Sequence, residues 1–290
     1  MRAAGFRIDV IYPADDPNTA LLSKDRETVR LLKPGAAPIA QGLPPFRPEA
    51  ILTKSGTSPG QGRAGMLYRD LIPGRLGGRY IASHISIPGG GPVSDWVHYH
   101  RISLQMIYVR RGWVRVVYED QGEPFVMNEG DLVLQPPEIR HRVLESSGPL
   151  EVVEITAPAA HETFADHRME LPAGDRPDRV YSGQRFLHHV AADRPWTLYR
   201  GAEAQETGML KATGGLCEVR TIRPAFAKTL EFAAYDGELV FGFVLDGTAK
   251  LNADRVRAAD AFVIPPGDPW TLSAMSDDFR LLHVTTARLD

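Results

Sequence analysis

Cysteine is nearly absent from this sequence of 290 residues, which contains only Cys217. No disulfide can form within the chain, so a disulfide-stapled secreted domain is excluded and a reducing, cytoplasmic setting is expected. Long hydrophobic runs are also missing: none approaches the roughly 20 apolar residues that a membrane-spanning helix needs. The first residues have no long apolar core, so we expect no signal peptide.

An excess of charge of one sign is missing as well. The chain has 33 Lys and Arg against 36 Asp and Glu, a formal net charge of −3 without charge blocks. Because nucleic-acid and membrane-surface proteins usually carry basic patches, neither partner is expected, and a small molecule is the expected ligand. Dinucleotide-binding, P-loop and GxSxG motifs are absent, so nucleotide binding and serine-hydrolase chemistry have no support.

Glycine and proline are plentiful. The 27 glycines and 23 prolines indicate many turns, as expected of short strands rather than long helices. Apolar and polar residues alternate over Trp113–Tyr118, which is typical of half-buried sheet, and Val152–Thr156 and Leu281–Thr285 read as further strands. Short helices are predicted only at Leu21–Leu32, where Ser23 could act as the cap, and at His161–Met169.

Four polar residues are placed so as to meet in space: His98, His100, Gln105 and His141. Residues two apart on a strand share a face, so His98 and His100 present two imidazoles to one side. A turn after His100 would bring Gln105 back to that face, and His141 would come from a distant strand. Two histidines inside an apolar barrel need a partner, and a metal cation is the simplest one. A bare HxH pair, by contrast, also fits an exposed edge strand.

The wider segment, GPVSDWVHYHRISLQMIYVRRGW followed by GDLVLQPPEIRHRV, resembles the two motifs of the cupin family, G(X)5HXH(X)3,4E(X)6G and G(X)5PXG(X)2H(X)3N. Gly112, Gly130 and Pro136 fall on motif positions. The stretch from Leu67 to Pro158 is also similar to a subgroup of cupin_2 proteins. The resemblance implies an all-β fold of antiparallel double-stranded β-helix (jelly-roll) barrels. It also implies one divalent transition metal ion, held by His98, His100, Gln105 and His141.

The sequence departs from the family pattern at defined places. Gln105 stands for the motif glutamate, Glu138 for a glycine and Glu145 for an asparagine, and six rather than five residues separate Gly91 from His98. A neutral amide leaves a divalent ion with its full positive charge, which strengthens it as a Lewis acid. Whether Gln105 coordinates stays open. Nitrogen and oxygen ligands suit Fe(II), Mn, Ni, Co, Cu or Zn, with Fe(II) favoured from the family.

The unit occurs twice. LYRDLIPGRLGGRYIASHISIP and MIYVRRGWVRV have weaker counterparts in LYRGAEAQETGMLKATGGLCEVRTIRP and VFGFVLDGTAKL, which predicts a two-barrel bicupin. In the second copy, the positions that match the four ligands are Ala233, Tyr235, Val240 and Trp270. Since none is a usual metal ligand, the second barrel is predicted to have lost the site. It would be structural, or a metal-free pocket lined by Tyr235 and Trp270.

The chain is therefore divided into an extension, two barrels and a linker. Part of the extension, residues 33–65, is expected to be an arm that wraps the second barrel or a neighbouring subunit, and a homodimer through edge strands is compatible with this. His188 and His189 read as linker or interface residues. The predicted boundaries are 1–65 for the extension, 66–160 for the metal-binding barrel, 161–196 for the linker and 197–290 for the degenerate barrel.

The leading functional hypothesis is an Fe(II)-type dioxygenase that acts on a small phenolic, enol or diketone substrate. The alternatives are a non-redox Mn or Zn lyase or isomerase, and a non-enzymatic small-molecule-binding protein. Arg79 and His84 could face the barrel mouth and hold an anionic substrate oxygen, or be a surface arginine and a rim histidine. His84 is the candidate catalytic base, and Glu138, near His141, is a weaker one.

Overall fold

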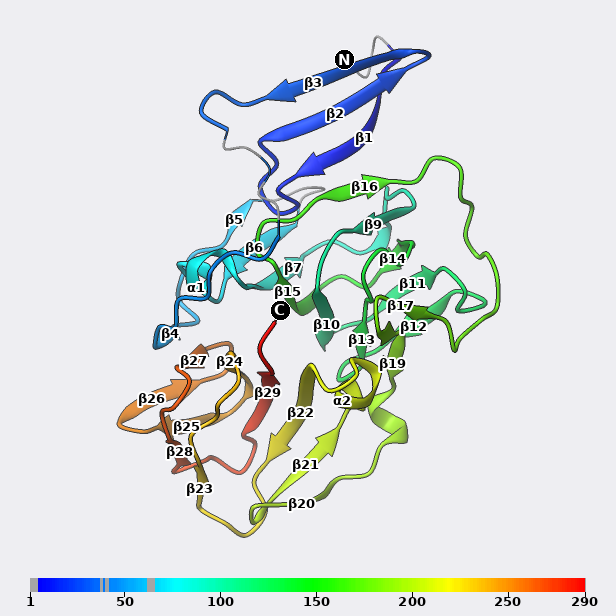
Figure 1. Cartoon of the computed structure of the whole chain (residues 1–290). Coiled ribbons are helices and arrows are strands. Elements are labelled where there is room, and N and C mark those ends of the chain that lie inside the picture. The colour runs from blue at the N-terminus through cyan, green and yellow to red at the C-terminus, as the bar shows by residue number, and fades with distance from the viewer. Residues whose placement is uncertain (1–4, 37–38, 40–41, 62–65, 290) are drawn as a thin grey trace.

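Strands make up almost all of the regular structure. The computed structural model describes residues 5–36, 39, 42–61 and 66–289, and it places two barrels one above the other (Figure 1). The helical elements of the described chain are single turns: α1 (Arg75–Gly78), α2 (Met209–Ala212) and the 3-10 turn η3 (Ala191–Asp193). In this part of the chain, no helix is long and apolar enough to cross a membrane.

Two antiparallel sheets build the first barrel. One has the order β12 (Phe125–Met127), β11 (Val114–Tyr118), β14 (His141–Ser146), β9 (His98–His100), β16 (Thr163–Ala165), β1 (Arg7–Tyr12), β2 (Thr19–Lys24) and β3 (Glu27–Leu32), with β8 (Gly91–Pro92) beside β14. The other has the order β19 (Leu187–His189), β13 (Leu132–Leu134), β10 (Leu104–Arg111), β15 (Leu150–Ala157), β7 (Ile81–Ile87), β6 (Leu67–Asp70) and β5 (Gly60–Gln61). A separate hairpin joins β17 (Val180–Tyr181) to β18 (Gln184–Arg185).

The second barrel repeats this plan. One sheet has the order β20 (Thr197–Tyr199), β21 (Ala202–Glu206), β22 (Cys217–Arg223), β29 (Arg280–Thr286), β24 (Leu239–Asp246), β27 (Ala261–Ile264) and β4 (Ile51–Thr53). The other has the order β23 (Thr229–Phe232), β28 (Trp270–Ser273), β25 (Thr248–Leu251) and β26 (Asp254–Arg257). The predicted all-β bicupin architecture is confirmed, and the closing strands β15 and β29 lie where alternation predicted them.

The largest apolar cluster lies between the barrels. Met106 and Tyr108 of the first barrel and Phe241 and Phe243 of the second are all buried in it. Successive side chains on a strand point to opposite faces, so each seven-stranded sheet has one face toward its own barrel and one toward the other barrel. The barrels therefore share one apolar core and are not independent domains joined only by a linker.

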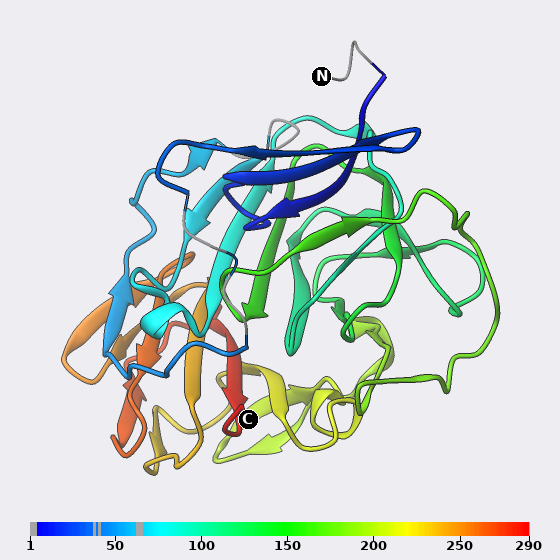
Figure 2. The same ribbon diagram turned by 45° about the horizontal axis from the view of Figure 1, so that its top comes forward.

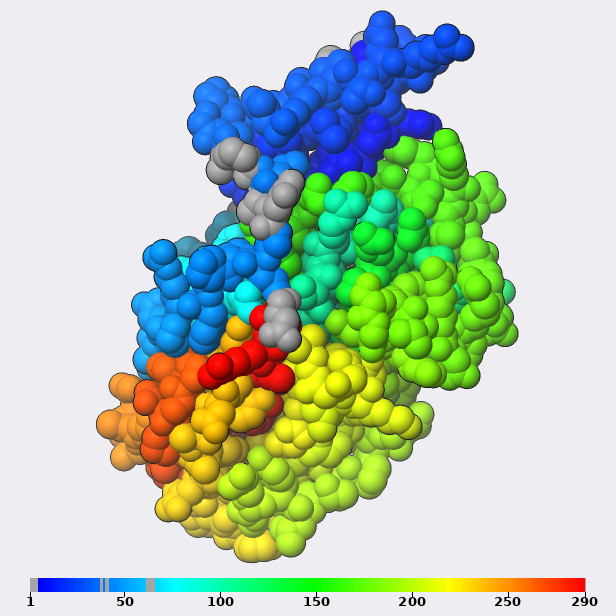
Figure 3. All heavy atoms as spheres, viewed as in Figure 1, coloured from blue at the N-terminus to red at the C-terminus, as the bar shows by residue number. Residues whose placement is uncertain are grey.

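The predicted helix at Leu21–Leu32 is wrong. This segment forms β2 and β3, joined by a tight turn in which Asp25 takes a φ of +53°. Together with β1 they make a three-stranded meander that projects above the first barrel (Figures 2 and 3). Helix propensity is a weak preference, and the ladders to β1 on one side and between the two strands outweigh it.

The predicted helix at His161–Met169 is also wrong. Its middle forms β16, which pairs with β9 on one side and β1 on the other. Nine residues make a helix that is marginal on its own, whereas β16 has a hydrogen-bonding strand on each side. The segment expected to be a linker, 161–196, thus supplies β16 and β19 to the two sheets of the first barrel.

The arm reaches the second barrel. Its strand β4 pairs with β27, with Leu52 opposite Phe262, and the backbone N–H of Ser55 donates to Asp260 Oδ1 at 2.7 Å. Residues 37–38, 40–41 and 62–65 of the predicted arm lie outside the described residues. The N-terminal extension therefore joins both barrels, since β1 belongs to a sheet of the first.

Candidate metal centre

Three buried histidines meet inside the first barrel. His98 and His100 come from β9, and His141, on β14, lies directly opposite His98. One ligand atom from each ring lies within 4.8 Å of those of the other two. The common face predicted from the HxH spacing, and the arrival of His141 from a distant strand, are both seen in this geometry. No other group of three such side chains occurs among the described residues.

The ring nitrogens are oriented for ligation. In His98 and His141, Nδ1 lies 2.8 and 3.0 Å from the carbonyl oxygen two residues earlier in the chain. A carbonyl can only accept, so Nδ1 carries the hydrogen and Nε2 keeps its lone pair. His100 Nδ1 lies 3.0 Å from Thr163 Oγ1 on β16. Metal-bound histidines usually have their second nitrogen tied in this way, so the donor set fits a divalent ion.

Gln105 lies beside these histidines. Strand β9 ends at His100 and β10 begins at Leu104, which is the turn that the sequence predicted. Gln135 is a further buried glutamine at this site, which the sequence analysis missed. Its Nε2 is 3.2 Å from Gln105 Oε1 and 3.1 Å from His141 Nε2. Its place directly before the motif prolines was the available signal.

The histidines open into a pocket of about 110 Å³ inside the barrel. Most of its wall is apolar, with side chains such as Ile85, Val114 and Val152. Glu154 is the only carboxylate, and neither lysine nor arginine occurs, among the described residues that line it. The pocket therefore suits a small and largely apolar molecule.

A second, smaller cavity of about 40 Å³ lies on the other side of His100 and Gln105. Glu154 borders it too, together with His161 and with Asp15 from the turn between β1 and β2. The buried ring of His161 lies 5.4 Å from that of His100. Sequence analysis missed Glu154, although its parity with Val152 on β15 would have predicted an inward side chain. It missed His161 because it assigned that segment to a helix.

Arg79 lies between the barrels and not at the mouth of the first. Its Nη2 is 2.6 Å from Oε1 of Glu238, in the second barrel, and its Nη1 donates to the carbonyl of Pro44 at 3.1 Å. The expectation that Arg79 faces the mouth is therefore not met. The Arg79 guanidinium points toward the second barrel and is not among the residues that line the pocket.

His84 also faces the second barrel. Its neighbour Ile85 lines the pocket, so strand parity turns His84 to the opposite side of β7, where its ring lies 5.5 Å from that of Phe243. Its Nε2 is 2.9 Å from Glu151 Oε2. The hydrogen bond from His84 and the charge of Arg110 lower the pKa of Glu151 to about 2. This geometry does not place His84 where a substrate-binding residue or a catalytic base would act.

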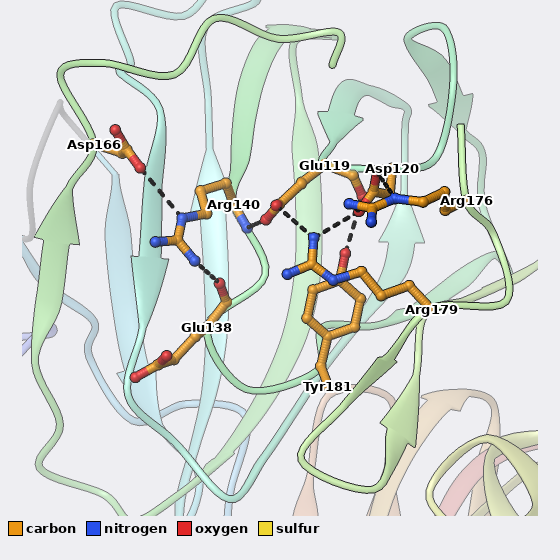
Figure 4. A network of polar contacts seen from close by, with 8 residues as sticks. All are labelled: Glu119, Asp120, Glu138, Arg140, Asp166, Arg176, Arg179 and Tyr181. Carbon is orange, nitrogen blue, oxygen red and sulfur yellow. Dashed lines mark hydrogen bonds and ion pairs between the residues drawn. The ribbon is translucent and has the colours of Figure 1, made fainter. Parts of the chain in front are cut away.

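Glu138 lies on the surface near the motif loop. Its side chain is about half exposed at 49% and faces Arg101, and it does not line the pocket. Figure 4 shows the loop from outside the barrel: Arg140 donates to the Glu138 carbonyl at 3.0 Å and to Asp166 Oδ2 at 3.3 Å. These contacts hold the chain just before His141.

In the second barrel, aromatic rings replace the ligands. Phe232 lies opposite Trp270, as His98 lies opposite His141 in the first barrel. Their rings stack with centroids 3.8 Å apart. Trp270 therefore matches His141 as predicted. Phe232, rather than the predicted Ala233, matches His98: the two repeats are so divergent in sequence that the predicted alignment is shifted by one residue here.

The other matched positions of the second barrel are apolar or aromatic. Val240, the predicted counterpart of Gln105, is buried in the apolar core, and Tyr235 packs against it. His283 lies beside the stacked rings, and burial together with the charges of Arg220 and Arg200 lowers its pKa to about 3, so the ring is neutral. The described residues of this barrel provide no metal-ligand cluster.

Comparisons with known proteins agree with this geometry. The family model of the cupin domain matches residues 83–156. Protein Ylba from E. coli is similar in structure, with a TM-score of 0.59 at 11% identity over 86% of this chain and 95% of that one. A tryptophan-to-phenylalanine variant of oxalate decarboxylase from B. subtilis has a TM-score of 0.59 at 12% identity, over 87% and 80%.

An arginine-to-alanine variant of the same decarboxylase has a TM-score of 0.57 at 12% identity, over 86% and 78% of the two chains. At these identities the likeness concerns the fold alone. No curated protein matches the sequence. Residues 83–156 thus match the cupin domain, the solved structures share the two-barrel fold over most of the chain, and the three histidines form one candidate metal site.

Proposed function

We propose that the first barrel is the active site of an Fe(II)-type dioxygenase for a small, mostly apolar enol, phenol or diketone. The observation that carries this proposal is a set of neutral donors, three imidazoles and the Gln105 amide, in an apolar pocket where Glu154 is the only carboxylate among the described lining residues. Neutral donors leave a divalent ion with its full charge, which favours an anionic oxygen ligand from the substrate.

When bound, the ion would supply a Lewis acid and a redox centre. His98, His100 and His141 would hold it, with Gln105 beside them. The apolar wall of the pocket would exclude water and orient the substrate by its shape. A small dicarboxylate would find no cationic side chain among the described lining residues, which argues for a substrate with at most one anionic oxygen.

Glu154 is the candidate for proton transfer. It borders both the pocket and the small cavity behind Gln105. We assign to its carboxylate the proton of the substrate O–H group, so that the substrate binds as an enolate or phenolate. Positioned carboxylates of this kind contribute about 100-fold or more to a rate.

A non-redox lyase or isomerase is the second candidate. It is favoured by the same carboxylate, since Glu154 beside neutral ligands could move a proton without any change of oxidation state. The two candidates differ in one requirement: the dioxygenase consumes oxygen, whereas the lyase or isomerase works with Mn or Zn under anaerobic conditions.

The test begins with metal content, by elemental analysis of wild type, a His98→Ala/His100→Ala double variant and the control His167→Ala. His167 is a surface histidine that contacts Asp9. Wild type and control should hold one ion per chain, and the double variant none. Stoichiometric metal in the double variant would overturn the site.

Oxygen uptake by the Fe(II)-loaded chain then follows, with β-diketones, catechols and simple phenols. Glu154→Gln should keep its metal and lose about 100-fold in uptake rate. No uptake on any substrate would sink the dioxygenase. Conversion of one of these substrates by the Mn- or Zn-loaded chain without oxygen would establish the lyase or isomerase instead.

A further inference from the structure

Two glutamines, not one, belong to the candidate metal centre. We infer that Gln135 is a positioning residue: it holds the Gln105 amide with its oxygen toward the three histidines and so makes Gln105 the fourth ligand. The inference rests on the proposed metal site and specifies how one ligand is oriented.

The two glutamines are held side by side. The backbone N–H of Gln135 donates to the backbone carbonyl of Gln105 at 2.9 Å, where the chain leaves β13 next to β10. Gln135 Nε2 donates to Gln105 Oε1 at 3.2 Å, and Tyr118 Oη donates to Gln135 Oε1 at 2.9 Å. All three residues are 2% exposed, so water does not compete with these bonds.

Gln135 determines the orientation of the Gln105 amide. An amide has a donor end and an acceptor end of almost equal size, so packing alone cannot decide which end of Gln105 faces the histidines. His141 decides it. Its Nδ1–H donates to the carbonyl of Ile139, so in the metal-free chain Nε2 is an acceptor and Gln135 turns its NH₂ group toward it. A bound ion would take that lone pair, and the bonds of Gln135 to Tyr118 and Gln105 would then keep the amide in place.

The same NH₂ group meets the oxygen of Gln105. Gln105 therefore presents its carbonyl oxygen, and not its NH₂ group, on the side of His141 Nε2. An amide oxygen has two lone pairs: one accepts from Gln135 and the second is suited to a cation. An amide oxygen can only accept, so in this contact Tyr118 Oη is the donor to Gln135 Oε1.

The experiment measures Co(II) binding by competition with a chromophoric chelator and records the visible Co(II) spectrum. Gln105→Met and Gln135→Met, which keep side-chain length, should each weaken binding about tenfold and change the spectrum in the same way. The double variant should bind no more weakly than either single variant. The matched control is Gln205→Met: Gln205, on β21 of the second barrel, is also buried and donates to the backbone carbonyls of Ala191 and Arg194, so affinity and spectrum should not change.

A wild-type affinity and spectrum in a folded Gln135→Met variant would overturn the inference, as would losses that multiply in the double variant. Circular dichroism and the melting temperature show that each variant is folded. If wild type bound no ion, the proposed function would fall separately. The NMR signals of the Gln105 side-chain amide in the metal-free chain would then decide: they must shift in Gln135→Met, and unchanged signals would refute the contact.

Discussion

Glu138 occupies the motif position at which cupins have glycine, and its φ of +62° gives the physical reason for that glycine. The left-handed conformation costs a residue with a Cβ atom about 1 kcal/mol, and β-branched residues more. The tight turn is needed because the next residues must bring His141 into the barrel. The Glu138 side chain makes an exposed contact with Arg101, and Arg140 donates to the backbone carbonyl of Glu138.

The stability change on substitution of Glu138 should therefore depend on the backbone conformation that the new residue prefers and not on its charge. Glu138→Gly relieves the strain but adds freedom to the unfolded chain, so we expect a change in stability between zero and a gain of about 1 kcal/mol. Glu138→Val should lose about 1–2 kcal/mol. Thermal unfolding of the two variants checks this. Equal melting temperatures for Glu138→Gly and Glu138→Val would show that the backbone at this position is not strained.

Residues of the site differ in how far the sequence alone could predict them. The spacing of His98 and His100 encodes a shared face, so strand periodicity sufficed. Gln135 acquires its role only through contacts with Tyr118 and Gln105, which lie 17 and 30 residues away in the chain. The side on which His84 lies could not be predicted, because alternation says that His84 and Ile85 face opposite ways but not which of them faces the pocket.

At the scale of elements, the stretch between β16 and β17 is fastened by ion pairs and a few backbone hydrogen bonds, whereas β19 further on is held by its pairing with β13. Asp120, at the end of β11, is buried and accepts hydrogen bonds from Arg176 and Arg179 (Figure 4). The Asp120 oxygen also lies so close to Gly174 that a Cβ atom would meet it at 2.1 Å. Such pairs join residues more than 50 positions apart, so no local pattern predicted them, and the segment read as a linker.

Asp120→Asn should loosen this segment. Asparagine keeps the shape and tolerates the φ of +60°, but it removes the charge on which both arginines converge. We expect a loss of about 1–3 kcal/mol and faster hydrogen exchange in the β17–β18 hairpin, with the exchange of β29 unchanged. Unchanged exchange in the hairpin would show that Asp120 does not fasten it.

The same contact has a predictable pH dependence. Burial alone would raise the pKa of Asp120, but the hydrogen bonds from Arg176 and Arg179 outweigh it and lower the pKa below its usual range. A lowered pKa in the folded state stabilises the fold above the ordinary value, about 3.9, and this stability is lost as the pH falls toward the lowered value. Wild type should therefore lose more stability than Asp120→Asn on acidification below about pH 4.

At the scale of the whole molecule, the second barrel is part of the architecture that supports the site. Its sheet packs on the back of the sheet that carries Gln105, and strand β4 of the extension pairs with it. The repeat in the sequence predicted two barrels. It did not predict the shared core, because a buried strand looks the same whether its outer face meets solvent-exposed loops or another sheet.

The ion pair of Arg79 with Glu238 tests how strongly the barrels depend on each other. Both side chains are less than 10% exposed, and Glu238 also accepts from Tyr80 at 2.8 Å. Arg79→Met leaves a buried carboxylate without its counter-charge, so urea unfolding should show a loss of about 3–5 kcal/mol. The double variant Arg79→Met/Glu238→Met removes both charges and should regain most of that loss, since the desolvation cost of the pair disappears as well.

Arg280→Met is the control for exposure: Arg280 pairs with Asp246 and, across the barrels, with Glu129, but these side chains are 38–50% exposed, so each pair should contribute at most about 1 kcal/mol. Co(II) affinity reports on the first barrel separately. If Arg79→Met lowers the stability of the whole chain in one transition, the barrels unfold together through their common core. Two separated transitions, with Co(II) binding retained after the first, would show that the first barrel folds without its partner and that the interface is dispensable for the metal site.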